Sequence, residues 1–291
     1  MGLMVRLRWP GGCIRAFTMS YDDGRMEDYR LADLMRKYGV KGTFNINTGL
    51  FYGDDKPDPA EKPLHRRMRK AELLRFAEEY KDLAEIAVHT RTHAGIATMS
   101  APQIVDEIIE DRVGIEEMLG QIIRGMAYPY GHCNDTIVRA AEACGMAYSR
   151  TTVSTEEFTV PRDWLRLPAT CHHKNPRLFE LADNFFAIEE KFNTAPKLFY
   201  LWGHSYEFDD CGNWDLIEKF LEKMGGRDDV WYATNIEIYD YVKAFEGLRW
   251  SARGDRVYNP GQIPVECIIY TGTSKPGTRY LFPAGEEVVL S

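Results

Sequence analysis

The feature that most constrains the fold is a regular alternation along the chain. Short runs of β-branched and aromatic residues alternate with amphipathic stretches of ten or more residues. This alternation is typical of βα units wound around a parallel sheet. About seven strands are predicted, a number that suits a distorted (β/α) barrel. The predicted strands cover residues 15–20, 42–47, 85–89, 123–128, 146–150, 198–203 and 230–234.

The helices predicted between these strands carry their own start and stop signals. Ser100 and Gln103 have the spacing of a capping box before an apolar-periodic run that ends at Leu119. Gly39 and Gly145 follow helical patterns and are predicted as C-terminal stops. The remaining predicted helices cover residues 28–38, 70–80, 135–144, 176–192, 214–224 and 236–245.

Two regions interrupt the alternation. Residues 48–62 are rich in Gly, Pro and Asp, which predicts a polar loop on the strand-exit side, where substrate-shaping loops tend to lie. From residue 251 the helical period disappears, and residues 266–271 and 279–290 are predicted as a small antiparallel β addition. The expected organisation is therefore a barrel over residues 1–250, with a β appendix over residues 251–291 packed on the same domain.

Composition excludes several classes of partner. The net charge of −8 over 291 residues argues against nucleic acid, because phosphate contacts need clustered Lys and Arg. The one basic cluster, residues 65–70, is predicted to be a solvated helix entry. No apolar run reaches the length of a signal peptide or a membrane span, and the six cysteines lie far apart. These features predict a cytoplasmic protein with reduced thiols and no membrane partner, while the oligomeric state is left open.

Two polar motifs follow predicted strands. Residues 20–24 read Ser-Tyr-Asp-Asp-Gly, and adjacent side chains on extended chain diverge, so one carboxylate could bind a cation while the other faces a reacting group. His89 and His93 would share one face of a helical turn. Two imidazoles and one carboxylate give zinc three protein ligands and leave a position open, as in catalytic sites. The alternatives are a plain turn for the first motif and capping or surface histidines for the second.

Two further motifs end predicted strands. Residues 128–131, Tyr-Pro-Tyr-Gly, form a tight exit whose backbone N–H groups could face a ligand, or a purely structural turn. Residues 200–206 contain the lone His204, which could also be a hydrogen-bonded core or rim residue. All four motifs lie where a predicted parallel strand gives way to a loop, the edge at which barrels place reactive groups. Independent turns would not need to agree in this way.

With these segments in hand, the chain resembles the polysaccharide deacetylases of the NodB homology type, carbohydrate esterase family four, over roughly residues 15–245. Residues 19–24 are similar to the family's Thr-Phe-Asp-Asp-Gly segment, residues 89–93 to its His-Ser/Thr-x-x-His segment, and residues 201–204 to its late Leu-x-His. The resemblance implies a distorted barrel and gives the motif residues their roles. Those roles are Asp22 as general base, His204 as general acid, and Asp23, His89 and His93 as metal ligands.

The resemblance has two departures. The family has an arginine in Arg-x-Pro-Tyr/Trp-Gly that braces the catalytic Asp, and here Ala127 stands in its place. Arg124 is an odd number of residues away, so its side chain would point to the opposite face of the strand. Arg91 or Arg166 is a candidate replacement, and the alternative is that Asp22 is tuned differently. In the family's Asp-x-x-Asp-Trp segment, the first Asp is replaced by Val160, which leaves open what braces the acid histidine.

The expected function is metal-dependent removal of an acetyl group from an N- or O-acetylated sugar or oligosaccharide. Zinc is the expected metal, with cobalt or nickel as alternatives, and the backbone N–H of Tyr130 is expected to share the oxyanion. Trp164, Trp202 and Tyr206 are candidate walls of a sugar pocket, with core packing as the alternative. A soluble sugar is expected rather than intact cell-wall polymer. The alternatives are an amidohydrolase acting on a small non-carbohydrate amide and a catalytically inactive carbohydrate-binding barrel.

Overall fold

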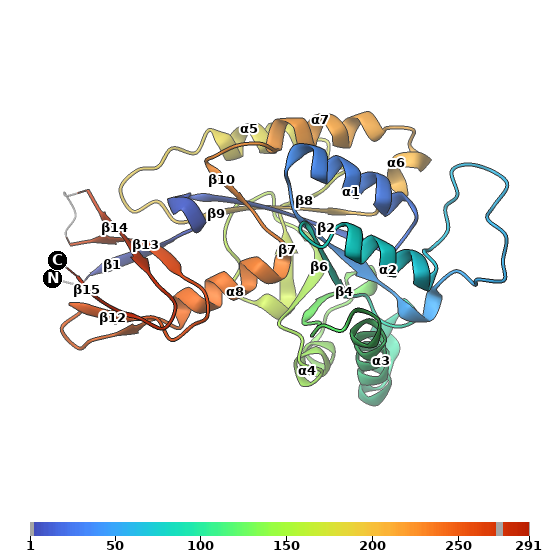
Figure 1. Cartoon of the computed structure of the whole chain (residues 1–291), viewed down its shortest axis with the longest axis horizontal. Helices are drawn as coiled ribbons and strands as arrows, with labels where there is room; N and C mark the ends of the chain where they lie inside the picture. Colours follow the sequence, from blue (N-terminus) through green and yellow to red (C-terminus); the bar gives the residue numbers. More distant parts are fainter. Residues whose placement is uncertain (1–2, 272–275, 291) are drawn as a thin grey trace.

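A parallel sheet forms the centre of the molecule (Figure 1). Its strands run in the order β7-β6-β5-β4-β3-β2-β9-β8, and β10 also pairs with β2. The two ends of this order, β7 and β8, are separated in the chain only by Thr170, so one short segment borders both β6 and β9. The strands are β2 (Arg15–Asp22), β3 (Gly42–Ile46), β4 (Ala84–Val88), β5 (Gly125–Ala127), β6 (Tyr148–Ser154), β7 (Leu167–Ala169), β8 (Cys171–His172), β9 (Lys197–Gly203) and β10 (Val230–Tyr232).

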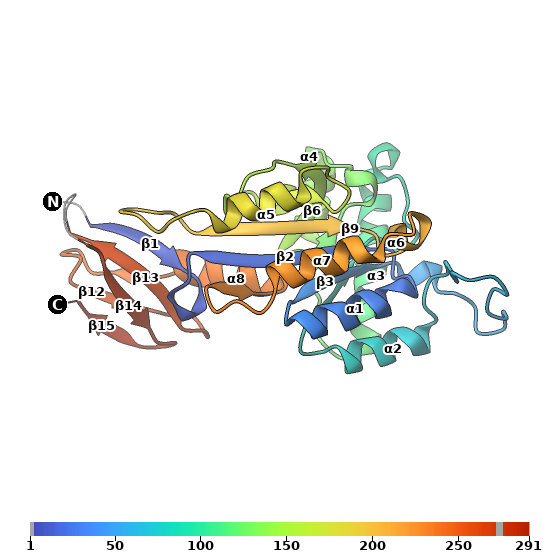
Figure 2. The same cartoon turned by 90° about the horizontal axis from the view of Figure 1, so that it is seen from above.

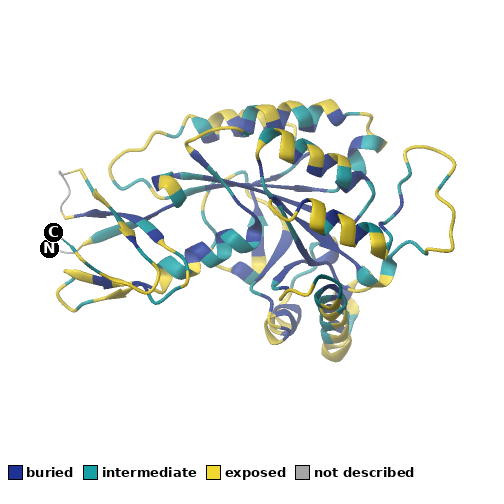
Figure 3. Ribbon diagram, in the orientation of Figure 1, coloured by how far each residue is buried: buried dark blue, intermediate teal, exposed yellow. Residues whose placement is uncertain are grey.

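Helices surround this sheet and expose their outer faces, whereas the strands are buried (Figure 3). The computed structural model describes residues 3–271 and 276–290. The helices are α1 (Glu27–Tyr38), α2 (Lys70–Glu79), α3 (Ala101–Leu119), α4 (Asp135–Ala143), α5 (Leu178–Phe186), α6 (Glu207–Asp210), α7 (Trp214–Met224) and α8 (Asn235–Glu246), with single 3₁₀ turns η1 (Pro10–Gly12), η2 (Thr48–Leu50), η3 (Ile96–Thr98), η4 (Pro129–Gly131) and η5 (Trp164–Arg166). The α/β class and all seven expected strands are confirmed.

Local signals set most helix ends. The capping box between Ser100 and Gln103 is formed at the start of α3, and Gly39 ends α1 in the left-handed conformation with φ of 65°. The prediction of one helix over residues 176–192 was wrong at both ends. The side chain of Arg15 donates to the last carbonyls of α5, at 3.2 Å to Phe185 and 3.0 Å to Phe186, and so caps the helix six residues early.

Antiparallel strands form two small sheets at one end of the elongated molecule (Figure 2). The first has the order β1-β13-β14 and the second β11-β12-β15. The expected antiparallel addition is confirmed, but residues 279–290 form two strands rather than one, and β1 joins β13 from the other end of the chain. Residues 272–275 and 291 of the predicted appendix lie outside the described residues. The strands are β1 (Met4–Arg8), β11 (Arg249–Trp250), β12 (Arg256–Tyr258), β13 (Val265–Tyr270), β14 (Thr278–Phe282) and β15 (Glu287–Val289).

A shared hydrophobic cluster joins this appendix to the central sheet and α8. Trp9 is fully buried beside β1, and its ring stacks on Trp231 of β10 at 5.4 Å and lies 6.0 Å from Tyr241 of α8. The hydroxyl of Tyr241 in turn donates to the carbonyl of Arg8 at 2.9 Å. The predicted boundary between the two parts of the chain at residue 250 therefore stays a prediction, and side-chain packing is continuous across it. All six cysteines are free thiols.

Within the described residues, the structure contains no helix with the length and apolarity needed to cross a membrane.

Candidate active site

The expected motif residues leave the sheet at its carboxyl edge. Asp22 is the last residue of β2 and Asp23 follows it, His89 follows β4, and His204 follows β9. Because β2 pairs in parallel with both β3 and β9, and β3 with β4, these strand ends lie together at one edge. The sheet therefore brings together residues that are nearly 200 positions apart in the chain.

Asp22 is held from both of its carboxylate oxygens. The side-chain amide of Asn45 donates to Oδ1 at 2.8 Å, and the guanidinium of Arg150 donates to Oδ2. The same Oδ2 lies 3.9 Å from Nε2 of His89 and 3.9 Å from Nε2 of His204. Burial alone would raise the pKa of Asp22, but Arg150, together with the two histidines, lowers that pKa to about 2. Asp22 is therefore a fixed carboxylate between two imidazoles.

Arg150 contacts Asp22, whereas this chain has Ala127 at the position of the family-motif arginine. It lies on β6, whereas Ala127 lies on β5, and the two residues are direct partners in the parallel ladder. Arg150 is fully buried, and its guanidinium lies 4.6 Å from the ring centre of Trp202. The positive charge beside Asp22 therefore comes from β6, the strand next to β5, on which the family motif has its arginine.

The two replacements considered from the sequence lie elsewhere. Arg91 pairs with Glu110 on α3, and Arg166 pairs with Asp163 and Asp135. Arg124 pairs with Asp240, consistent with its side chain pointing away from Asp22.

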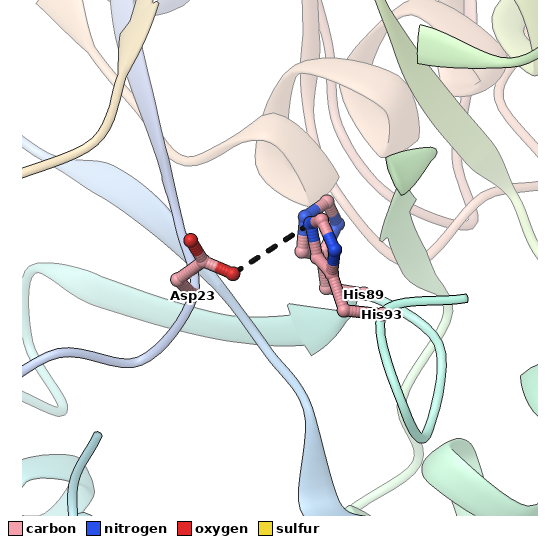
Figure 4. A group of neighbouring side chains, drawn as sticks. All are labelled: Asp23, His89 and His93. Atoms are coloured by element: carbon pink, nitrogen blue, oxygen red, sulfur yellow. Dashed lines mark ion pairs between the residues drawn. The ribbon is translucent and has the colours of Figure 1, made fainter. Parts of the chain in front are cut away.

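Asp23, His89 and His93 form a compact group of possible metal ligands (Figure 4). Their ligand atoms all lie within 4.8 Å of one another, and Nε2 of His93 is 3.7 Å from Oδ1 of Asp23. Two imidazoles and a carboxylate are the donor set expected of a catalytic zinc site. Burial would raise the pKa of Asp23, but His89, with Arg67 and His93, lowers it, so the carboxylate is ionised and able to bind a cation.

The hydrogen bond on His89 fixes which ring nitrogen faces the group. Nδ1 lies 2.8 Å from the carbonyl oxygen of Ala127, which can only accept, so Nδ1 carries the proton and Nε2 keeps a free lone pair. Asp111 of α3 accepts the backbone N–H of His89 at 3.0 Å and so fixes the main chain as well. His89 is thereby oriented as a metal ligand requires.

The turn that carries the two histidines is not helical, contrary to the sequence expectation. Thr90 and His93 have positive φ angles of 60° and 53°, and Asp23 and Tyr130 adopt the same left-handed region at 84° and 58°. Residues other than glycine rarely adopt this conformation, and such backbone clusters at functional sites. The left-handed residues, rather than a helical repeat, bring the rings of His89 and His93 to 4.9 Å.

A second group of His and Glu side chains lies beside His204. Nε2 of His172 and of His173 lie 3.1 Å and 3.2 Å from Oε2 of Glu207, and Nδ1 of His204 is 3.4 Å from the same oxygen. Lys174 donates to the other oxygen of Glu207 at 2.8 Å. Burial would raise the pKa of Glu207, but these donors hold it far below its usual range. Glu207 is a carboxylate surrounded by positive or donating groups.

The protonation of His172 separates this group from the metal-ligand group. Its Nδ1 accepts the backbone N–H of Lys174 at 3.1 Å, so the proton of a neutral ring resides on Nε2, the nitrogen that faces Glu207. A protonated Nε2 donates to the carboxylate and cannot bind a metal. The tautomer of His89 therefore leaves Nε2 free for a cation, whereas the tautomer of His172 does not.

Glu207 also acts on the charge of His204. Burial lowers the pKa of His204, but Glu207, Asp22 and Asp23 raise it above its ordinary value. A raised pKa favours the protonated ring, which is the form required of a general acid near neutral pH.

The expected pocket aromatics divide into two sets. The rings of Trp202 and Tyr206 lie 6.1 Å and 5.3 Å from the ring of His204, and the largely exposed ring of Tyr130 lies 4.7 Å from that of His93. Trp164 is buried and packs edge-on against Tyr239 of α8 at 5.2 Å. Of the three expected pocket aromatics, the structure thus places Trp164 in the core away from His204, whereas Trp202, which is buried, and Tyr206 lie beside His204.

The sequence matches the family model described as polysaccharide deacetylase over residues 12–149. The matched segment covers slightly less than half of the chain. This segment contains Asp22, Asp23, His89 and His93, whereas His204, Arg150 and Glu207 lie beyond it. A comparison with curated proteins found no match.

Solved structures of polysaccharide deacetylases and related esterases resemble the chain. The family 4 carbohydrate esterase domain of a xylanase from the hindgut metagenome of Trinervitermes trinervoides is 15% identical, with a TM-score of 0.49, over 79% of this chain and 92% of its own. The family 4 carbohydrate esterase of Streptomyces lividans, in complex with acetate, is 14% identical, with a TM-score of 0.48, over 76% and 93%. A Streptococcus pyogenes deacetylase in complex with acetate is 22% identical, with a TM-score of 0.40, and the match covers 46% of this chain and 55% of that protein.

Several positioning residues were missed at the sequence level. Arg150 ends the predicted strand 146–150, so pairing that strand beside Ala127 could have found it. Glu207 lies three residues after His204, a spacing that places two side chains on one side of a turn. Asn45 and Asp111 give no sequence signal, because a lone amide in a strand or a lone carboxylate on a helix is common.

Proposed function

We propose that this protein is a metal-dependent deacetylase that removes an acetyl group from an N- or O-acetylated sugar or oligosaccharide. The observation that carries the proposal is the position of Asp22, whose Oδ2 lies 3.9 Å from Nε2 of both His89 and His204. A base, a ligand imidazole and an acid imidazole are the parts that hydrolysis of an acetyl group needs at one point.

The metal would be held by Asp23, His89 and His93. The tautomer of His89 and the ionised carboxylate of Asp23 fit such an ion, and zinc is the first candidate, with cobalt or nickel as alternatives. When bound, the ion would supply a Lewis acid that polarises the acetyl carbonyl and acidifies water.

The protein side chains would handle the protons. Asp22 takes a proton from the attacking water, and the developing oxyanion accepts a hydrogen bond from the backbone N–H of Tyr130. His204, kept protonated by Glu207, donates a proton to the departing sugar nitrogen or oxygen, so the products are acetate and the deacetylated sugar. Arg150 and Asn45 keep the carboxylate of Asp22 from rotating during this transfer. Trp202 and Tyr206 would contact the sugar ring beside His204.

Release of acetate from a panel of N- and O-acetylated sugars, with added zinc, cobalt or nickel, tests the activity. Elemental analysis and three variants test the roles. Asp22→Asn should abolish turnover and keep the metal, whereas His89→Ala should lose both. His172→Ala is the matched control, since it removes an imidazole from the second group and should leave the metal content unchanged.

Each contrary result has a definite meaning. Metal lost from His172→Ala but kept in His89→Ala would show that the metal binds at the second group, which contains His172, and that the assignment to Asp23, His89 and His93 is wrong. Acetate release by metal-free protein would rule out the mechanism. Turnover of a non-carbohydrate amide with no acetylated sugar accepted would favour the amidohydrolase alternative, and tight sugar binding without acetate release would favour the binding barrel.

A further inference from the structure

The basic segment at residues 65–70 is built into the site rather than solvated. The backbone N–H of Met68 donates to the carbonyl of Gly24 at 2.8 Å, and that of Met26 donates to the carbonyl of Arg66 at 3.0 Å. Residues 24–26 follow Asp23 directly, so these bonds hold the segment against the carboxylate. The segment does lead into α2, but the expectation that it is solvated was wrong.

The arginines of this segment have different partners. Arg66 pairs with Glu72 at 2.6 Å and with Asp58 at 2.9 Å, and Arg69 pairs with Asp58 at 2.8 Å. Arg67 instead turns inward, and its Nη2 donates to Oδ1 of Asp23 at 2.8 Å. Among the described residues, Asp23 is the only carboxylate within ion-pair distance of Arg67.

The oxygen that Arg67 contacts is the one that faces the imidazoles. Oδ1 of Asp23 lies 3.7 Å from Nε2 of His93 and accepts from the guanidinium at the same time. The two side chains are 19% and 7% exposed, so water screens their charges weakly. A divalent cation bound by Asp23 would either lie close to this guanidinium or displace it from its one carboxylate partner. Both outcomes reduce the favourable free energy of metal binding.

We infer that Arg67 is an internal competitor for the metal, which neutralises Asp23 in the metal-free protein and weakens the affinity of the site for a divalent cation. This inference rests on the proposed function, because it assigns Asp23, His89 and His93 as the ligands. The opposite role is also physically defined: a guanidinium that orients Asp23 would strengthen metal binding, as partners of metal ligands commonly do. The direction of the change in affinity separates the two roles.

The test is calorimetric titration of metal-stripped, full-length protein with zinc. Arg67→Gln should bind zinc at least tenfold more tightly than the wild type, and Arg67→Met should do the same without a hydrogen-bonding side chain. Arg67→Lys, which keeps the charge, should stay near the wild type. Arg69→Gln is the matched control, because it removes an arginine from the same segment that contacts Asp58 and Glu72 instead of Asp23.

Unchanged or weaker zinc binding in both charge-removing variants would overturn the inference, since a structural or orienting role predicts that direction. Equal tightening in Arg69→Gln would also overturn it, because the effect would then be general charge. The proposed metal centre itself fails if the wild type does not bind zinc, or if His89→Ala binds zinc as tightly as the wild type. The inference about Arg67 fails separately if the wild type binds zinc through His89 and Arg67→Gln binds it equally tightly.

Discussion

The buried ion pair between Arg150 and Asp22 predicts that loss of Arg150 lowers both stability and turnover, and that a second substitution restores both. Both side chains are almost completely excluded from water, at 0% and 3% exposure, so water cannot replace a lost partner. Removing one partner of a buried ion pair costs about 3–5 kcal/mol, because the other charge remains buried and unpaired. Arg150→Met should therefore lower the melting temperature by roughly 10 °C for a chain of this size and raise the pKa of Asp22. Turnover should fall by about 10²-fold or more, as expected when a general base is lost.

The ladder between β5 and β6 offers a rescue of this variant. Ala127 is the direct strand partner of Arg150, so its side chain points to the same face of the sheet and is fully buried. Ala127→Arg combined with Arg150→Met should recover both stability and acetate release, because a guanidinium from position 127 enters the space that Arg150 leaves. Ala127→Arg alone should destabilise the protein through overpacking.

Thermal unfolding followed by circular dichroism, together with acetate release at saturating substrate, measures both effects. A double variant no more stable and no more active than Arg150→Met would refute the idea that one charge position can be filled from either strand. An Arg150→Met variant that melts like the wild type would refute the premise that Asp22 depends on this partner.

Three further outcomes are expected. Burial raises the pKa of Glu85 from its ordinary 4.5 to about 7, so stability should fall as pH rises from about 4.5 to 7, by at most about 3 kcal/mol, and Glu85→Gln should flatten that slope in denaturant titrations. Asp111→Ala removes one of the two acceptors of the backbone N–H of His89, the other being the carbonyl of Ile46, and should weaken zinc binding by about 10–100-fold in calorimetry. Unchanged affinity would show that the bond to Ile46 is enough to position His89. Glu207→Gln removes a group that raises the pKa of His204, so the alkaline limb of the kcat–pH profile should move to lower pH with metal content constant, and an unmoved limb would show that Glu207 does not control the acid.

The sheet was predictable because its signals are local. The run of β9 is apolar on both faces, as expected of a strand covered on both sides, and the alternation of strands with helices then leaves few topologies. Glycine stops and the capping box at Ser100 act within one turn, so they also appear in the sequence. The early end of α5 was not predictable, because Arg15, which caps it, comes from a strand about 170 residues earlier.

The proximity of the proposed ligand, base and acid residues was predictable for a different reason. Asp22, Asp23, His89, His93 and His204 each follow a strand, and parallel strands all end at one edge, so strand prediction alone brings them to one rim. The geometry within that rim was not predictable, because it depends on left-handed backbone at Thr90 and His93 that no residue type there requires.

The positions of the supporting charges show what the sequence motif does and does not constrain. In the proposed mechanism, Asp22 needs a cation at one point in space, and a point beside a parallel sheet can be reached from two neighbouring strands. A motif that specifies the arginine on β5 therefore records one of two equivalent solutions, and this chain uses the other, with Arg150 on β6. The same reasoning applies to His204, whose carboxylate partner comes from Glu207 on its own turn instead of from a distant segment. Substituting a motif position thus does not by itself predict loss of activity, and the rescue of Arg150→Met by Ala127→Arg tests that equivalence directly.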